Sequence, residues 1–219
     1  MDWAADPENL TISPGYLRLR RLNRALMDTW FREISLVDID TLPDAGGILF
    51  TAWHPGGLID PMLMMAALPG NLTVAAKHTL FKVPILGMMM RIAGAKPVYR
   101  AQDVIPQNEG DGQRTAKNQT LIESMGDALS EGGRVAIFPE GVTHLKSHPV
   151  RLRTGAARIL LHALQKSRAE GVAQPHIVPL GLHYSDQHQF RERVSLQVNQ
   201  PLPIPPLPGE DGAPEPSEE

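Results

Sequence analysis

Residues 48–61 of the chain have the sequence ILFTAWHPGGLIDP, and this stretch decides the fold. The apolar run 48–52 predicts a buried strand, and the apolar segment 62–68 predicts a short helix. His54 and Asp60 therefore lie in a turn between a strand and a helix, separated by two glycines that allow a sharp bend or the close approach of a substrate. An imidazole beside a carboxylate can act as a general base, because the carboxylate fixes the ring tautomer and stabilises the imidazolium.

The same residues also match an ordinary helix start. Asp is a preferred N-cap residue and Pro is favoured at the first helical position. Taken alone, Asp60 and Pro61 favour a capped helix over a base with its partner. The rest of the chain is needed to choose between these two interpretations.

Strands and helices alternate along the chain. Besides 48–52, the segments that predict strands are 35–40 at an edge, 71–76, 96–99, 134–138, 177–182 and 194–198. Besides 62–68, the segments that predict helices are 14–32, 79–93, 114–131 and a largely buried 154–169, with a loop at 103–113. The alternation predicts an α/β fold with a single central mixed, largely parallel sheet flanked by helices. In such sheets, ligands bind where strands end and loops begin.

The pattern divides the chain into an N-terminal helical segment, residues 1–34, a main domain, residues 35–200, and a tail, residues 201–219. The tail holds seven prolines with glycine and acidic residues, which predicts either disorder or a wrapped extension and not a second domain. The N-terminal helix is amphipathic and basic, with arginines at 18, 20, 21, 24 and 32. It fits either an anchor on anionic lipid or a helix packed on the domain with its arginines in water.

Composition excludes several classes of protein and site. The net charge of −3 gives no general attraction to nucleic acid, and the absence of cysteine excludes disulfides, zinc–thiolate sites and a cysteine nucleophile. No apolar run approaches the roughly 20 residues that span a bilayer. The acidic residues 1–8 lack the apolar core of a secretory signal. Composition therefore predicts a cytoplasmic protein and leaves open whether it is peripheral on the inner face of the membrane.

Polar residues follow three of the predicted strands. His54 follows 48–52, Arg100 follows 96–99, and Glu140 with Gly141 follows 134–138. A guanidinium suits a phosphate, and a glycine lets backbone N–H groups approach an anion. Each feature alone also fits an ordinary strand end or turn. Together they predict a site at one edge of the sheet.

These residues lie in four blocks, in order, that resemble the phospholipid/glycerol acyltransferase family. This PlsC-type domain is typified by lysophosphatidic acid and glycerol-3-phosphate acyltransferases. The four blocks are 54–61 (HPGGLIDP), 94–100 (GAKPVYR), 138–143 (FPEGVT) and 178–182 (VPLGL), with weaker echoes at 77–87 and 153–156. The resemblance covers about residues 47–200, so it implies that the main domain, residues 35–200, is an acyltransferase domain.

The resemblance implies a chemistry and a role for each residue. His54 would be the base that activates an acceptor hydroxyl, and Asp60 would orient and charge it. The acceptor's glycerol phosphate would be held by Arg100, Glu140, Gly141 and, as a weaker candidate, Arg153. The partners would be an acyl-thioester donor, acyl-CoA or acyl-ACP, and a glycerophosphate or lysophospholipid acceptor. A thioester is already activated, so the reaction needs no metal or other cofactor.

The chain also departs from the family pattern. Trp53 stands where the family usually has Asn, Gly56 and Gly57 stand where larger or polar residues are common, and Lys96 replaces an apolar residue. These departures keep open an O-acyltransferase for a different lipid alcohol. A non-catalytic lipid-binding protein of the same fold is a further alternative, which the intact His54 and Asp60 argue against.

Other classes of site have less support. The chain contains no Gly-x-Ser-x-Gly of a serine hydrolase and no glycine-rich nucleotide-binding motif. His144 and His148 have a spacing that suits a metal on a helix, but Pro149 predicts a loop there, and we expect no metal site.

Overall fold

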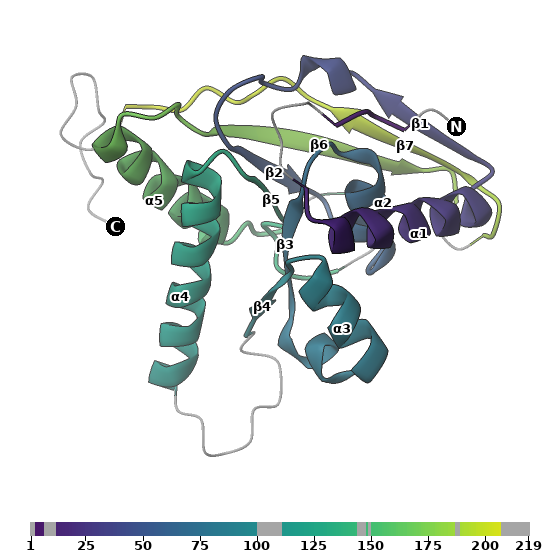
Figure 1. The fold of residues 1–219 in the computed structure, drawn as a ribbon, viewed down its shortest axis with the longest axis horizontal. Helices are drawn as coiled ribbons and strands as arrows, with labels where there is room; N and C mark the ends of the chain where they lie inside the picture. The colour runs from purple at the N-terminus through teal and green to yellow at the C-terminus, as the bar shows by residue number, and fades with distance from the viewer. Residues whose placement is uncertain are drawn as a thin grey trace.

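The computed structural model of the chain describes residues 3–6, 12–99, 111–143, 148, 150–186 and 189–206. Seven strands in this part form one sheet in the order β1-β7-β6-β2-β5-β3-β4 (Figure 1). The strands are β1 (Glu33–Val37), β2 (Ile48–Ala52), β3 (Leu72–Lys77), β4 (Lys96–Val98), β5 (Arg134–Ile137), β6 (His176–Tyr184) and β7 (Arg193–Val198). Only the β6–β7 pair is antiparallel. The predicted mixed, largely parallel sheet is confirmed. β1 is the expected edge strand, but it begins and ends earlier than the predicted segment 35–40.

Helices cover both faces of the sheet. On one face lie α1 (Pro14–Trp30), α2 (Ile59–Ala67) and α3 (Pro84–Ile92), and on the other lie α4 (Asp111–Ser130) and α5 (Gly155–Glu170) (Figure 1). Two short 3₁₀ helices, η1 (Ile39–Thr41) and η2 (His78–Lys82), complete the described elements.

Strand β2 is central, and its sequence explains its position. Phe50 packs in the core shared with α1 and α2, whereas Leu49 packs in the core shared with α4 and α5. Both side chains are fully buried. A strand covered on both faces needs apolar residues without alternation, which is the pattern of residues 48–52.

Three predicted helices differ in detail. The predicted helix 79–93 is divided into η2 and α3, because Pro84 lacks a backbone N–H and begins a new helix at its first position. Helix α4 begins at Asp111, inside the predicted loop 103–113. Helix α5 buries one side and not most sides: its buried residues are Ala156, Ile159, Ala163, Leu164 and Ser167.

Helix α1 packs on α2 through polar side chains. Arg20 and Asn23 are buried, whereas the apolar Leu22 is 54% exposed. Arg20 donates to the carbonyl oxygen of Gly70 at 3.3 Å, and Arg24 donates to that of Ala66 at 2.8 Å. These oxygens lie at and after the end of α2, where carbonyl groups lack partners within the helix. The expectation that the arginines of this helix face water is therefore wrong for Arg20 and Arg24.

The first residues of the tail lie beside the sheet. The Leu202 N–H donates to the Ile177 oxygen of β6 at 2.9 Å. Within the predicted tail, 201–219, this contact favours a wrapped extension over disorder at Leu202, and residues 207–219 lie outside the described part. In the described part, no helix is both long enough and apolar enough to cross a bilayer.

Candidate active site

The turn between β2 and α2 brings His54 and Asp60 together. His54 Nδ1 lies 2.8 Å from Asp60 Oδ2, and the Asp60 side chain is fully buried. An ionised carboxylate can only accept hydrogen bonds, so we assign the ring proton to Nδ1. The neutral imidazole then has a free electron pair on Nε2, which is the form a general base requires.

Both carboxylate oxygens of Asp60 have donors. The Gly56 N–H donates to Oδ2 at 2.8 Å, and the Tyr184 hydroxyl donates to Oδ1. Burial and the adjacent Asp60 carboxylate raise the pKa of Tyr184 far above its usual value, so the hydroxyl keeps its proton. A buried carboxylate needs such partners, because desolvation without them is costly.

Asp60 does not cap helix α2. The N-cap residue is Leu58, and its side chain makes no capping hydrogen bond. Asp60 is the second residue of the helix, and its carboxylate faces His54. The capped-helix interpretation is therefore wrong.

Gly56 is required by the close packing around Asp60. A Cβ atom at residue 56 would lie 2.5 Å from Asp60 Oδ1 and 3.1 Å from the Tyr184 hydroxyl. Any larger residue would push the carboxylate out of place. Glycine at position 56, where the family commonly has a larger or polar residue, therefore fits the close packing of this turn.

Phe138 covers one face of the His54 ring. The two rings are stacked, with centroids 3.9 Å apart and an angle of 18° between their planes. Phe138 follows β5, and β2 pairs with β5 in parallel, so both residues lie at the carboxyl edge of the sheet. The stack holds the imidazole in one orientation.

The predicted residues of the third block lie in one turn. Gly141 has a φ of +68°. A Cβ atom added at Gly141 would lie 3.0 Å from both Cδ and Nε of Arg153. Glu140 is 4% exposed and accepts the Val150 N–H at 3.1 Å. The carboxylate of Glu140 thus supports this turn, while the exposed Arg153 packs against Gly141. Arg100 lies outside the described residues.

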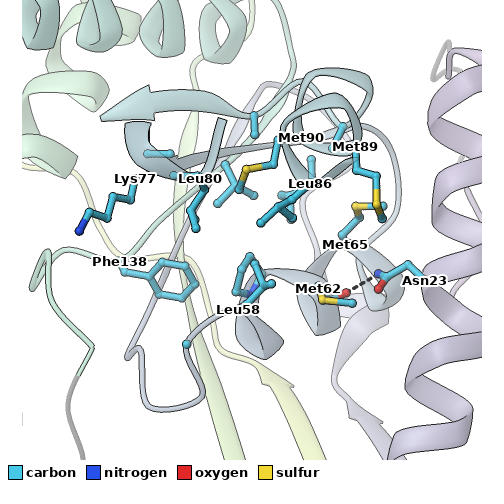
Figure 2. A pocket seen from close by; sticks show the side chains of 18 of the residues that line it. Asn23, Leu58, Met62, Met65, Lys77, Leu80, Leu86, Met89, Met90 and Phe138 are labelled. Carbon is cyan, nitrogen blue, oxygen red and sulfur yellow. Dashed lines mark hydrogen bonds between the residues drawn. The ribbon is translucent and has the colours of Figure 1, made fainter. Parts of the chain in front are cut away.

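A largely apolar pocket of about 340 Å³ adjoins His54 (Figure 2). Its size suits a small-molecule site. Helices α1, α2 and α3 and strand β3 enclose it, with four methionines: Met62, Met65, Met89 and Met90. Its polar lining residues are Asn23, His54, Lys77 and Thr143. Within the described ranges, no group of three His, Cys, Asp or Glu side chains could hold a metal ion.

Sequence reasoning assigned no role to three residues of this site. Phe138 lies within the third block that resembles the family, and Lys77 lies within the weaker echo at 77–87, so their positions there are a usable signal. Tyr184 is 124 residues from Asp60 in the chain, and no local pattern marks it.

A family model and curated relatives identify the class of protein. The family model described as Acyltransferase matches residues 33–183, more than half of the chain. An uncharacterized acyltransferase of Schizosaccharomyces pombe is 26% identical over 82% of this chain and 38% of its own length. Glycerol-3-phosphate O-acyltransferase 2 of Saccharomyces cerevisiae is 33% identical over 40% of this chain and 11% of its own. The chain thus spans well under half the length of either relative.

A solved structure has the same fold. The crystal structure of the 1-acyl-sn-glycerophosphate (LPA) acyltransferase PlsC from Thermotoga maritima matches 90% of this chain and 72% of its own, with a TM-score of 0.61. The sequence identity is 14%, so this likeness concerns the fold alone. The matched family model, together with the His54–Asp60 turn at the carboxyl edge of the sheet, assigns the chain to the acyltransferase family.

Proposed function

We propose that the chain transfers a fatty acyl group from an acyl thioester, acyl-CoA or acyl-ACP, to a hydroxyl of a glycerol phosphate or lysophospholipid. The observation that carries this proposal is the meeting of a His–Asp pair and an apolar pocket. His54 belongs to both. A base beside a space that suits a hydrocarbon chain is what acyl transfer to an alcohol requires.

The proposed step conserves protons and bonds. His54 Nε2 takes the proton of the acceptor hydroxyl while the hydroxyl oxygen attacks the thioester carbonyl carbon. The tetrahedral intermediate collapses, the carbon–sulfur bond breaks, and the departing thiolate takes the proton back from the imidazolium. Asp60 stabilises that imidazolium, and the Tyr184 and Gly56 donors keep Asp60 in position before reaction.

Two observations support a phosphate-bearing acceptor. Lys77 ends β3 and lines the same pocket as His54, and Arg153 lies beside Gly141 in the third-block turn. Both are cations suited to a phosphate. The names of the Saccharomyces cerevisiae relative and the Thermotoga maritima structure also point to glycerol phosphate and its monoacyl ester. We therefore favour this acceptor class, with Arg100, Glu140 and Gly141 as further acceptor residues from the family pattern.

The helices around the pocket support a site at the membrane surface. Ile85 and Met88 of α3 are 72% and 54% exposed, and Leu22 of α1 is 54% exposed beside the exposed Arg18 and Arg21. Exposed apolar side chains flanked by arginine suit the interface of an anionic leaflet. We include peripheral attachment to the inner face of the membrane in the proposal. Vesicle flotation should require anionic lipid and weaken in Ile85→Ser.

Thiol release from a long-chain acyl thioester tests the reaction. Wild type and His54→Ala are compared with glycerol-3-phosphate, with lysophosphatidic acid and without acceptor. We expect release that depends on an acceptor and falls by about 10²–10⁴-fold in His54→Ala. His54-dependent release without acceptor would instead make the protein a thioesterase. Folded protein that binds lysolipid without any release would favour the non-catalytic interpretation.

A further inference from the structure

One residue of the pocket wall has a buried polar atom without a hydrogen-bond partner among the described residues. Asn23 of α1 is 4% exposed, and its Oδ1 has no donor within hydrogen-bond distance among the described residues. Asn23 is also one of the residues that form the pocket wall. Buried carbonyl oxygens in proteins nearly always accept a hydrogen bond. The donor for this oxygen would therefore have to come from a bound molecule.

The orientation of the Asn23 amide is fixed by its other contact. Nδ2 donates to the Met62 backbone oxygen at 2.6 Å. Met62 O can only accept, so exchanging the amide nitrogen and oxygen would bring two acceptors together. Oδ1 is therefore the atom left for a further hydrogen bond, and the donor it lacks must carry an O–H or N–H group.

Asn23 lies at the end of the pocket away from the reacting group. Phe138, which stacks on His54, and Asn23 are on opposite sides of the pocket in Figure 2. Met62 and Met65 lie on the Asn23 side of that view. These unbranched side chains change conformation easily, so they can move aside for a chain that reaches Oδ1.

We propose that Asn23 selects an acyl chain that carries a hydroxyl group on its remote part. This inference rests on the proposed function, because it assumes that the thioester carbonyl lies at His54 and the hydrocarbon chain fills the pocket. The chain hydroxyl would donate to Oδ1 of Asn23, whereas an unsubstituted chain would leave that oxygen buried and unpaired. A site with an unpaired buried acceptor discriminates against the analogue that lacks the donor.

The test compares acyl thioesters of one chain length. One member is unsubstituted, and the others carry a hydroxyl at successive positions from the middle to the end of the chain. For at least one position, wild type should show a kcat/KM roughly tenfold above that of the unsubstituted donor. Asn23→Leu keeps the branched shape without polar atoms, so it should use both donors alike. Asn23→Ala, with a thermal melt, provides a second variant in case the first does not fold.

Ser167→Ala is the matched control, because it also removes a buried oxygen that has no hydrogen-bond partner among the described residues, but in α5 and outside the pocket wall. Its ratio of hydroxylated to unsubstituted turnover should stay that of wild type. A second readout is the thermal stabilisation by free hydroxylated and unsubstituted fatty acids, which needs no turnover.

The outcomes separate this inference from the proposed function. Equal use and equal binding of all donors by wild type would overturn the role of Asn23, as would a preference that persists in Asn23→Leu. Turnover of the unsubstituted donor in either case would leave acyl transfer standing. Stronger binding of a hydroxylated acid that depends on Asn23, without turnover of any thioester, would support the pocket assignment and overturn the acyl-transfer proposal.

Discussion

Strand β2 has one closely packed glycine before its first residue and another after its last residue. The two glycines have different roles. Before the strand, a Cβ at Gly47 would lie 1.9 Å from the Leu129 backbone oxygen of α4. After the strand, a Cβ at Gly56 would lie 2.5 Å from Asp60 Oδ1. Neither position has room for a side chain. At the first end the close neighbour is backbone that holds α4 on the sheet, and at the second it is the carboxylate that partners His54.

The two ends of β2 therefore differ in role: the amino end contributes to stability, and the carboxyl end contributes to the reaction. The amino end of β2 is closed by backbone contacts: the Ile48 N–H donates to Gly133 O at 3.0 Å, and the His176 N–H donates to Gly47 O at 2.8 Å. The carboxyl end opens into the pocket beside His54. Changes at the amino end should therefore alter unfolding, and changes at the carboxyl end should alter turnover.

The largest effect is expected for Asp60→Asn. The amide nitrogen would face either the His54–Gly56 donors or the Tyr184 hydroxyl, which disturbs the ring tautomer that the carboxylate selects. We expect kcat to fall by about 10³–10⁴-fold, with the fold retained. Steady-state kinetics with circular dichroism measures this. A kcat within threefold of wild type would exclude Asp60 as the partner of the base.

Gly47→Ala should mainly reduce stability. The added methyl group meets backbone of α4, which cannot turn aside, so α4 must shift from the sheet. Overpacking of a core costs typically 1–3 kcal/mol, and a backbone collision lies at about the upper end of that range. Urea unfolding gives the free energy of unfolding, and kcat of the remaining folded protein should equal that of wild type. A loss of kcat with unchanged stability would contradict the division between the two ends.

Gly56→Ala should show the reverse pattern. The methyl group displaces the Asp60 carboxylate, and the turn at the surface can relax more easily than α4 can. Misplacement of a catalytic group by about 1 Å costs on the order of 10²-fold in rate. We expect kcat to fall by about that factor with a smaller loss of stability than in Gly47→Ala. Equal losses of unfolding free energy in both glycine variants would contradict the proposed difference between Gly47 and Gly56.

Tyr184→Phe is a second test of the carboxyl end of β2. The variant removes the donor to Asp60 Oδ1 and leaves the ring in place. Loss of one donor to a buried charged group should lower kcat roughly tenfold while KM stays unchanged. Tyr16→Phe is the matched control: the Tyr16 hydroxyl is also buried, but it accepts the Leu72 N–H at 2.9 Å, so that variant should lose stability and keep kcat. Similar kcat values for the two variants would assign Tyr184 a purely structural role.

The smallest effect concerns pH and the contact of the N-terminal residues with α1. Burial alone raises the pKa of Asp6, but hydrogen bonds from Arg20 and the Gly70 N–H outweigh it and hold the pKa below its usual 3.8. The stabilisation is therefore present above pH 3.8 and is lost as the pH falls through the lower folded value. Wild type should be more stable than Asp6→Asn at pH 7, and the difference should shrink below pH 3.8. A difference that does not vary with pH would show that the charge plays no part.

Patterns with a local cause were predictable from sequence. The run 48–52 matches β2 residue for residue, because a central strand is apolar on both faces. The boundary at Pro84 was misjudged because the apolar pattern continues across it, although proline starts a helix there. The His54–Asp60 pair was predictable only as one of two interpretations, since a short turn allows Asp60 either to cap α2 or to meet the ring.

The sequence alone determined the α/β class, the order of the elements and the membership of the acyltransferase family, because periodicity and short motifs are local properties. Tertiary structure alone decided which face of α1 is buried, since Arg20 and Arg24 find carbonyl partners only once α2 lies against them. It also decided the partner of Asp60, because the hydroxyl of Tyr184 reaches it only after β6 pairs with β2. The pocket beside His54 likewise exists only between packed helices, so no segment by itself encodes it.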